Sequence, residues 1–218
     1  ACIHSSWLEG RNIIIASGYC YYSAFGGKWI KIQSEMSERK TRLLFLIHSL
    51  YGGGAERSFL DVLAGLDRQI FEPHLVVWED EGAYMDAVPG DVPRHILPEP
   101  SNFILSRHLL LIRALNSVIK KVQPQVLMSF LDGSNVLALE TKLLLKPGCS
   151  FVISQRNNMS ISFERRYAYK GFRRWLKMSY VRWLYPKADH IIALSHGVKA
   201  DLVDNFGMPA EKISPIHN

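Results

Sequence analysis

Three consecutive glycines, Gly52, Gly53 and Gly54, follow an apolar run, and Glu56 and Arg57 come shortly after them. Glycine lets backbone N–H groups approach a ligand closely, and the N-terminus of a helix carries a partial positive charge. A phosphate or diphosphate is therefore the ligand that this segment suits. It matches neither the GxGxxG fingerprint nor a Walker loop. An ordinary strand-to-helix turn is the alternative.

Three further polar clusters follow apolar runs, at residues 132–135, 155–158 and 195–197. Ligands of open α/β sheets bind beyond the carboxyl ends of the strands, so these clusters would share one rim with the glycines. Their joint placement indicates a binding site at this rim, whose polar residues include Asp132, Arg156, Asn157, Ser195 and His196. Helix caps and turns are the alternative explanation for each cluster.

From residue 42 onward, apolar runs alternate with amphipathic stretches. This pattern predicts an α/β fold with an open, mostly parallel, Rossmann-like sheet and helices on both faces. The predicted strands are 43–49, 74–78, 94–97, 126–130, 151–154 and 190–194, with a last short strand near the end. The predicted helices are 55–66, 107–122, 134–145 and 198–205, together with a long basic stretch that reaches about residue 185.

The basic stretch, residues 164–187, holds eight Lys or Arg and a single acid. Projected as a helix, it places an apolar side opposite a basic side, and the apolar side consists of Ala168, Phe172, Trp175, Leu176 and Trp183. A basic amphipathic helix with Trp suits an anionic membrane surface, and an apolar side packed on the sheet is the equal alternative. Val181 and Leu184 project onto the basic side, which suggests a break after Met178. The basic side consists of Arg166, Lys170, Arg173, Arg174 and Lys177.

Composition limits the class of protein. Nearly half of the 218 residues are apolar, and the net charge is +6. This is typical of a folded globular chain with an anionic partner. The three cysteines show no CxxC pair, so we expect neither a disulfide framework nor a metal site, and a cytoplasmic location fits. The positive charge is confined to one segment and no nucleic-acid-binding motif accompanies it, so we expect no nucleic acid partner.

Residues 1–41 differ from the rest. The apolar run 12–30 resembles a signal peptide or a short membrane span, but its Gly, Ser and Tyr content argues against both. Met36 begins a phrase that leads directly into the first predicted strand. We therefore expect residues 1–41 to be an N-terminal extension, disordered or foreign to the native protein, and residues 42–218 to be the domain.

The phrases LLFLIHSLYGGGAERSFLDVLAGL, VLMSFLDGSN, VISQRNN and HIIALSHGVKADLVDNFGMPAEKISPIHN resemble the acceptor-side domain of retaining GT-B glycosyltransferases of family 4. The resemblance covers about residues 42–218. It implies one half of a GT-B fold in an enzyme that transfers a sugar from a nucleotide sugar to a lipid-linked or polysaccharide acceptor, at the inner face of the membrane. It also implies that no metal or other cofactor is needed, since the nucleotide sugar is a co-substrate.

The same resemblance assigns roles to residues. It puts Gly52, Gly53 and Gly54 beside a phosphate, with Glu56 and Arg57 shaping that loop. Arg156 and Asn157 match an Arg-Asn phrase of some members and would contact the acceptor. The family's His after the fourth strand is absent here, which leaves Asp132 as the candidate to take its place. The family's two-glutamate motif and diphosphate clamp belong to a second, donor-binding domain, so we expect no turnover from this chain alone.

Two other functions stay open. The chain could be a non-catalytic acceptor- or membrane-binding fragment, because GT-B chemistry takes place between two domains. More remotely, residues 193–197 resemble a degenerate nucleophile elbow of an α/β-hydrolase, with Ser195 as the nucleophile. Chain order opposes the hydrolase, because the acid and the histidine that should follow have almost no room after Ser195.

Overall fold

The computed structural model describes residues 13–16, 19–23, 29–32, 40–98, 104–167 and 171–217, and contacts divide the chain into units 1–40 and 41–218. In the first unit, three strands form an antiparallel sheet: β1 (Ile13–Ala16), β2 (Tyr19–Ser23) and β3 (Trp29–Ile32). The sequence predicted no strands here, because runs such as Ile-Ile-Ile-Ala lack the alternation that identifies a half-buried strand. That this segment is foreign to the native protein stays a prediction.

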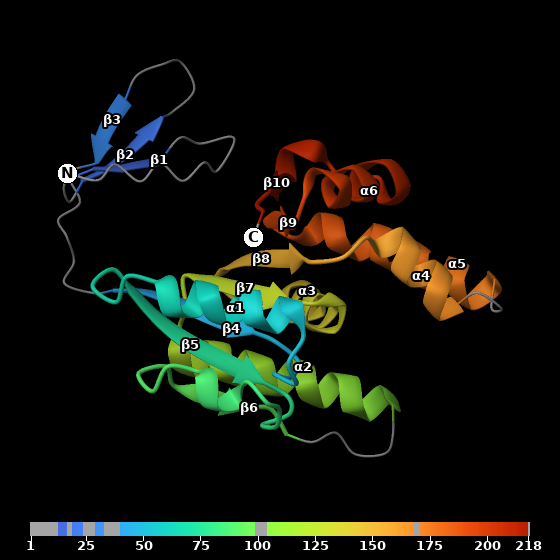
Figure 1. Ribbon diagram of the computed structural model, residues 1–218, viewed down its shortest axis with the longest axis horizontal. Coiled ribbons are helices and arrows are strands. Elements are labelled where there is room, and N and C mark those ends of the chain that lie inside the picture. Colours follow the sequence, from blue (N-terminus) through green and yellow to red (C-terminus); the bar gives the residue numbers. More distant parts are fainter. Residues whose placement is uncertain are drawn as a thin grey trace. The chain divides into compact units, whose positions relative to one another are not determined.

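The second unit contains a seven-stranded parallel sheet in the order β10-β9-β8-β7-β4-β5-β6 (Figure 1). The predicted open, Rossmann-like sheet is thereby confirmed. The interior strand that contains Leu44, Phe45 and Leu46 is a continuous apolar run in the sequence, and all three residues are buried, so both faces of the strand are covered. The strands are β4 (Thr41–Leu46), β5 (Phe71–Val77), β6 (Arg94–Ile96), β7 (Val126–Phe130), β8 (Ser150–Gln155), β9 (His190–Ala193) and β10 (Ile213–Pro215).

Helices cover both faces of this sheet. Phe45 of β4 packs with Phe59 and Leu63 of α1 on one face, whereas Leu44 packs with Leu115 of α2 on the other. Figure 1 shows α1 and α2 on opposite sides of β4 and β5. The described helices are α1 (Gly54–Gly65), α2 (Ile104–Val122), α3 (Asp132–Leu145), α4 (Met159–Tyr167), α5 (Gly171–Leu184) and α6 (His196–Phe206), with 3-10 turns η1 (Met85–Ala87), η2 (Tyr185–Lys187) and η3 (Ala210–Lys212).

The basic stretch differs from its prediction. The structure describes it as two helices, α4 and α5, and α5 continues without interruption to Leu184. The break expected after Met178 is therefore wrong. Val181 and Leu184, which projected onto the basic side, are buried in a core cluster with residues of β9 and α6. Packing against these neighbours, rather than the composition of the helix, decides which side is covered.

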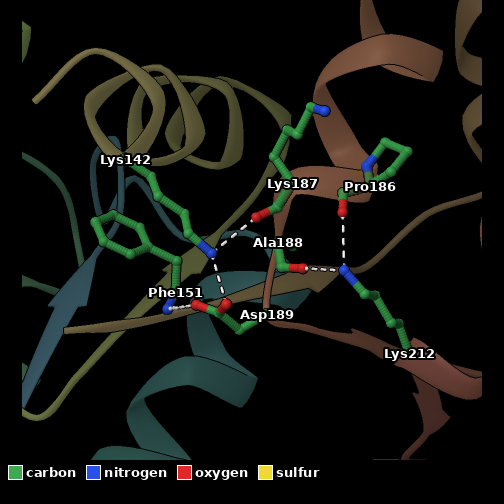
Figure 2. A network of polar contacts seen from close by, with 7 residues as sticks. All are labelled: Lys142, Phe151, Pro186, Lys187, Ala188, Asp189 and Lys212. Atoms are coloured by element: carbon green, nitrogen blue, oxygen red, sulfur yellow. Dashed lines mark hydrogen bonds and ion pairs between the residues drawn. The ribbon is translucent and has the colours of Figure 1, made fainter. Parts of the chain in front are cut away.

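A polar network fixes the amino ends of β8, β9 and β10 (Figure 2). Lys142 of α3 donates to the Asp189 carboxylate at 2.6 Å and to the carbonyl of Lys187 at 2.8 Å. The second oxygen of Asp189 accepts the backbone N–H of Phe151 at 2.7 Å. Lys212 donates to two further carbonyls of this turn, at 2.9 and 3.1 Å. The network ties α3, β8, β9 and η3 together at the edge opposite the polar clusters found in the sequence.

Candidate functional site

The candidate site lies at the carboxyl ends of the parallel strands, which all meet one edge of the sheet. A cavity of about 670 Å³ lies away from this edge, between the C-terminal ends of α2 and α3. It is lined mainly by residues 116–125 and 145–149, near the amino ends of β7 and β8, so it does not mark the site. The polar groups at the carboxyl edge come from the segments after β4, β5, β7, β8 and β9.

The glycine loop joins β4 to α1. Gly52 has φ +123°, a conformation that side-chain-bearing residues rarely adopt, and Gly53 is the N-cap of α1. Gly53 offers no side chain to cap the helix. A carboxylate oxygen of Glu56 occupies the space where a Cβ at position 53 would lie. The exposed first turn keeps amides that suit an anion, while Glu56 brings a carboxylate beside them.

An acidic loop, residues 79–82, runs beside the glycine loop. Tyr84 donates its N–H to the Leu50 carbonyl at 3.0 Å, and a Cβ at Gly82 would collide with the backbone of residues 50–51. A hydrogen bond to Glu79, followed by desolvation and by the nearby charges, raises the pKa of Tyr51. The acidic loop therefore puts negative charge on one side of the glycines and favours the α1 side for an anion.

A buried amide joins two of the polar clusters that the sequence singled out. Gln155 is fully buried, and its Nε2 donates to Asp132 Oδ1 at 3.0 Å and to Asn157 Oδ1 at 2.6 Å. Its Oε1 accepts the hydroxyl of Tyr185 at 3.3 Å. Tyr185 is itself buried, and this burial raises its pKa, so the phenol stays protonated as a donor. Asp132 and Asn157 are thus held together in fixed orientations at the ends of β7 and β8.

A second buried amide supports this arrangement from below. Ser129 of β7 donates to Asn135 Oδ1 at 2.7 Å, and Asn135 Nδ2 donates to the carbonyl of Ser154 at 3.1 Å. All three residues are fully buried. They join β7, β8 and the first turn of α3, which carries Asp132. The Asn135 amide, which is buried and hydrogen-bonded through both its oxygen and its nitrogen, makes this part of the site rigid.

The other predicted site residues lie along the same edge in different surroundings. Arg156, directly after β8, is half-buried, and burial lowers the pKa of its guanidinium. Arg57 is exposed on α1. Ser195 is the N-cap of α6, and its hydroxyl accepts the N–H of Val198 at 3.2 Å. The His196 ring lies 5.4 Å from the ring of His217. The serine thus has a structural role, and the substrate contacts of these residues stay predictions.

Sequence reasoning missed a group at the ends of β4 and β5. His48 Nε2 lies 3.3 Å from Glu79 Oε1, and the His48 ring centroid lies 4.4 Å from that of Trp78. A Cβ at Gly133, beside Asp132, would lie 3.6 Å from the Trp78 ring. This group therefore adjoins the Asp132 turn. The sequence contains a signal for this group, since His48, Trp78 and Glu79 lie at the ends of two predicted strands. Only the strand order in the folded sheet shows that these two strands are neighbours.

Helix α5 carries a surface that we name the aromatic face: Phe172, Trp175, Leu176, Tyr180 and Trp183. The exposed fractions are 75% for Phe172, 60% for Trp175 and 52% for Trp183, so the alternative in which this apolar side packs on the sheet is wrong. Figure 1 shows α4 and α5 side by side at one end of the second unit.

Basic residues lie on the other side of α5. Arg173 and Lys177 are exposed, while Arg174 is half-buried and paired with Glu164 at 3.1 Å. The side chains of Arg166 and Lys170 lie outside the described residues. No described helix is long and apolar enough to span a membrane. Within the same residues, no group of three His, Cys, Asp or Glu side chains is placed to hold a metal.

Comparison with known proteins identifies the family. The model of Glycosyltransferase Family 4 matches residues 52–218. The chain belongs to this family. A transferase of Campylobacter jejuni, N-acetylgalactosamine-N,N'-diacetylbacillosaminyl-diphospho-undecaprenol 4-alpha-N-acetylgalactosaminyltransferase, is 29% identical over 185 residues. That alignment covers 81% of this chain and 47% of the relative, so the chain spans about half the length of the curated relative it matches.

Solved structures show the same fold. A glycosyltransferase from Rickettsia africae aligns with a TM-score of 0.58 and 17% identity, over 83% of this chain and 43% of that one. The Anabaena protein HepE, solved with UDP and glucose, aligns with a TM-score of 0.60 and 14% identity, over 82% of this chain and 44% of that one. The predicted N-terminal half of a GT-B glycosyltransferase is confirmed. Family membership also sets aside the α/β-hydrolase.

Proposed function

We propose that the complete protein transfers a sugar from a nucleotide sugar to a lipid-linked acceptor, with retention of the anomeric configuration. Membership of family 4 supports the transfer, and the acceptor named for the Campylobacter relative, a diphospho-undecaprenol, supports the lipid link. The bond from the anomeric carbon to the nucleoside diphosphate breaks, and the leaving group takes the electron pair. The acceptor hydroxyl forms the new bond and gives its proton to the leaving phosphate. In this proposal a second domain binds most of the donor, and no metal takes part.

The carboxyl-end rim provides the acceptor contacts in this proposal. Asp132 and Asn157 are fixed by Gln155, so they meet a substrate without first losing side-chain freedom. Arg156 is next to them in the chain, and a guanidinium suits the planar, bidentate recognition of phosphate. The amides at the start of α1 offer a second contact for a phosphate. The fixed Asp132–Gln155–Asn157 group is the observation that carries the assignment of the acceptor to this rim.

The protein acts, in the same proposal, at the inner, cytoplasmic face of an anionic membrane. Exposed Trp and Phe side chains enter the boundary between headgroups and acyl chains, and neighbouring Lys and Arg attract anionic lipid. Phe172 and Trp175 pack on each other, with ring centroids 6.1 Å apart, and Arg173 and Lys177 lie on the same helix. Helix α5 therefore carries both kinds of side chain that such binding requires, the aromatic residues on one side and Arg173 and Lys177 on the other.

Transfer by the complete gene product tests the reaction. Nucleotide sugars and an undecaprenyl-diphosphate-linked sugar are the substrates, and NMR of the product gives its anomeric configuration. We expect transfer with retention that EDTA leaves unchanged. Asp132→Asn keeps an oxygen that can accept from Gln155 but removes the negative charge. The loss of one charged hydrogen bond to the acceptor should lower kcat/KM by about 10- to 150-fold. The exposed Asp61→Asn serves as control. Absence of transfer from every nucleotide sugar tried would refute the proposal.

Vesicle sedimentation tests the membrane surface. We expect binding to vesicles that contain phosphatidylglycerol, and little binding to pure phosphatidylcholine. Replacing both Phe172 and Trp175 by Ser should reduce binding at least about tenfold, since each buries apolar area in the lipid. Ile70→Ser, at an exposed apolar position on a loop outside α5, is the matched control. Equal binding by the double variant and the control would contradict this part of the proposal.

A further inference from the structure

Three helices on one face of the sheet enclose an apolar groove of about 540 Å³. It lies between α2, α3 and α5, away from the carboxyl-end rim, and none of the predicted site residues lines it. Six of its lining residues are Leu109, Ile112, Leu143, Leu144, Tyr180 and Trp183. A volume of this size is in the range of small-molecule sites, which are mostly apolar.

The polar groups of the groove are engaged with one another. His108 Nδ1 lies 3.0 Å from Glu140 Oε2, and the hydroxyl of Tyr180 donates to Glu140 Oε1. Burial opposes ionisation of Glu140, but the hydrogen bonds from His108 and Tyr180 outweigh it and lower the pKa of the carboxyl. The groove thus offers an occupant mainly leucine and aromatic side chains, which favours a hydrocarbon over a polar ligand.

The groove is continuous with the aromatic face, because Tyr180 and Trp183 belong to both. It is also within reach of the rim. At 1.5 Å per residue, Glu140 is about 12 Å and Leu144 about 18 Å along α3 from Asp132. A hydrocarbon chain whose charged head lies at the rim can therefore pass between α2 and α5 before it enters the lipid.

We infer that this groove holds the first part of the prenyl chain of the acceptor. The inference rests on the proposed lipid-linked acceptor and adds to it a binding site for the lipid. A prenyl diphosphate held in this way presents its head to the rim while its tail continues along the aromatic face. A bilayer acyl chain is a poorer occupant, because its headgroup would have to leave the membrane surface to reach the rim.

Two pairs of adjacent exposed leucines allow a matched test. Leu144 and Leu109 line the groove and are 58% and 44% exposed, whereas Leu145 and Leu110 lie outside it and are 42% and 43% exposed. Each is replaced by Asp in turn. All four positions are exposed, so the substitutions leave the fold intact, and the two groove variants come from different helices.

The measurement is calorimetric binding of farnesyl diphosphate, with inorganic diphosphate and dodecyl phosphate as comparison probes, to the chain described here. We expect Leu144→Asp and Leu109→Asp to weaken farnesyl diphosphate at least about tenfold, with Leu145→Asp and Leu110→Asp within about twofold of wild type. Binding of inorganic diphosphate should be equal in all five proteins.

Equal losses in groove and control variants would overturn the inference, as would wild-type affinity no higher for farnesyl diphosphate than for inorganic diphosphate. Dodecyl phosphate that binds as tightly, with the same dependence on Leu144, would overturn the choice of a prenyl chain. These results are independent of the transfer assay. If the complete protein transfers sugar but the binding pattern is absent, only the inference about the groove is refuted. If the binding pattern is present but no transfer occurs, only the proposed reaction is refuted.

Discussion

Asp201→Ala should detach the start of α4 from α6, because Asp201 caps α4 from another helix. Its Oδ2 accepts the backbone N–H groups of Met159 at 2.8 Å and Ser160 at 3.1 Å. Its Oδ1 accepts the hydroxyl of Ser160 and the side-chain amide of Asn205, the latter at 2.8 Å. Asp201 is only 5% exposed, so water cannot replace these bonds without local opening.

The size of the effect follows from the bonds lost. A hydrogen bond to a charged group contributes about 1.5–3 kcal/mol, and each buried donor left without a partner costs about 1–3 kcal/mol. The bonds share one carboxylate and are not additive, so the expected loss of unfolding free energy is about 3–5 kcal/mol. Asp201→Asn keeps one acceptor oxygen and should lose about 1–2 kcal/mol.

Urea unfolding measures the global loss, and hydrogen exchange locates it. We expect the amides of α4 to lose protection first, while β4 and β7 keep theirs. The exposed Asp204→Ala, on the same helix, is the matched control and should stay within about 0.5 kcal/mol of wild type. Indistinguishable stability of the Asp201 and Asp204 variants, or uniform loss of protection across the sheet, would refute the reasoning.

Two further predictions concern the acidic loop and the groove. Gly82→Ala, at φ +129° and against the backbone of residues 50–51, should destabilise by about 1–3 kcal/mol or more, whereas Gly65→Ala, in open space at the end of α1, should be neutral or slightly stabilising in urea unfolding. Equal effects would contradict the role of the backbone contact. The pKa of Glu140 is lowered in the folded state, so the Glu140 carboxylate stabilises the fold at pH values above its ordinary pKa of 4.5. This stabilisation is lost as the pH falls through the folded pKa. Glu140→Gln should therefore flatten the acid limb of stability against pH, and an unchanged limb would show that His108 and Tyr180 do not hold the carboxylate.

The sequence predicted most of the second unit because its signals are local. Strand 126–130 was predicted with the bounds of β7, and α1 and α3 each begin within two residues of their predicted starts. Apolar runs and helical periodicity depend only on neighbours in the chain. The same locality explains the errors: α5 has apolar residues on more than one side, so its periodicity could not tell which side the core would cover.

Part of the site was predicted from the same kind of local signal. Polar clusters after strands mark the rim, and Asp132, Arg156 and Asn157 lie at adjacent strand ends as expected. Gln155 was found as a member of the cluster 155–158, but its role in joining two clusters could not be predicted, because Asp132 and Asn157 meet only when β7 pairs with β8. The pair of His48 and Glu79 depends in the same way on the pairing of β4 with β5.

The sequence by itself determined the alternation of strands and helices, the position of the glycine loop and the family, because each is written in residues that are close along the chain. Only the tertiary structure decided that α5 presents its aromatic side chains outward, that α2, α3 and α5 enclose a groove, and that Asp201 caps a helix other than its own. The physical reason is the same for all three. Exposure, enclosure and long-range hydrogen bonds are properties of elements in contact, and the packing of the whole sheet selects those contacts.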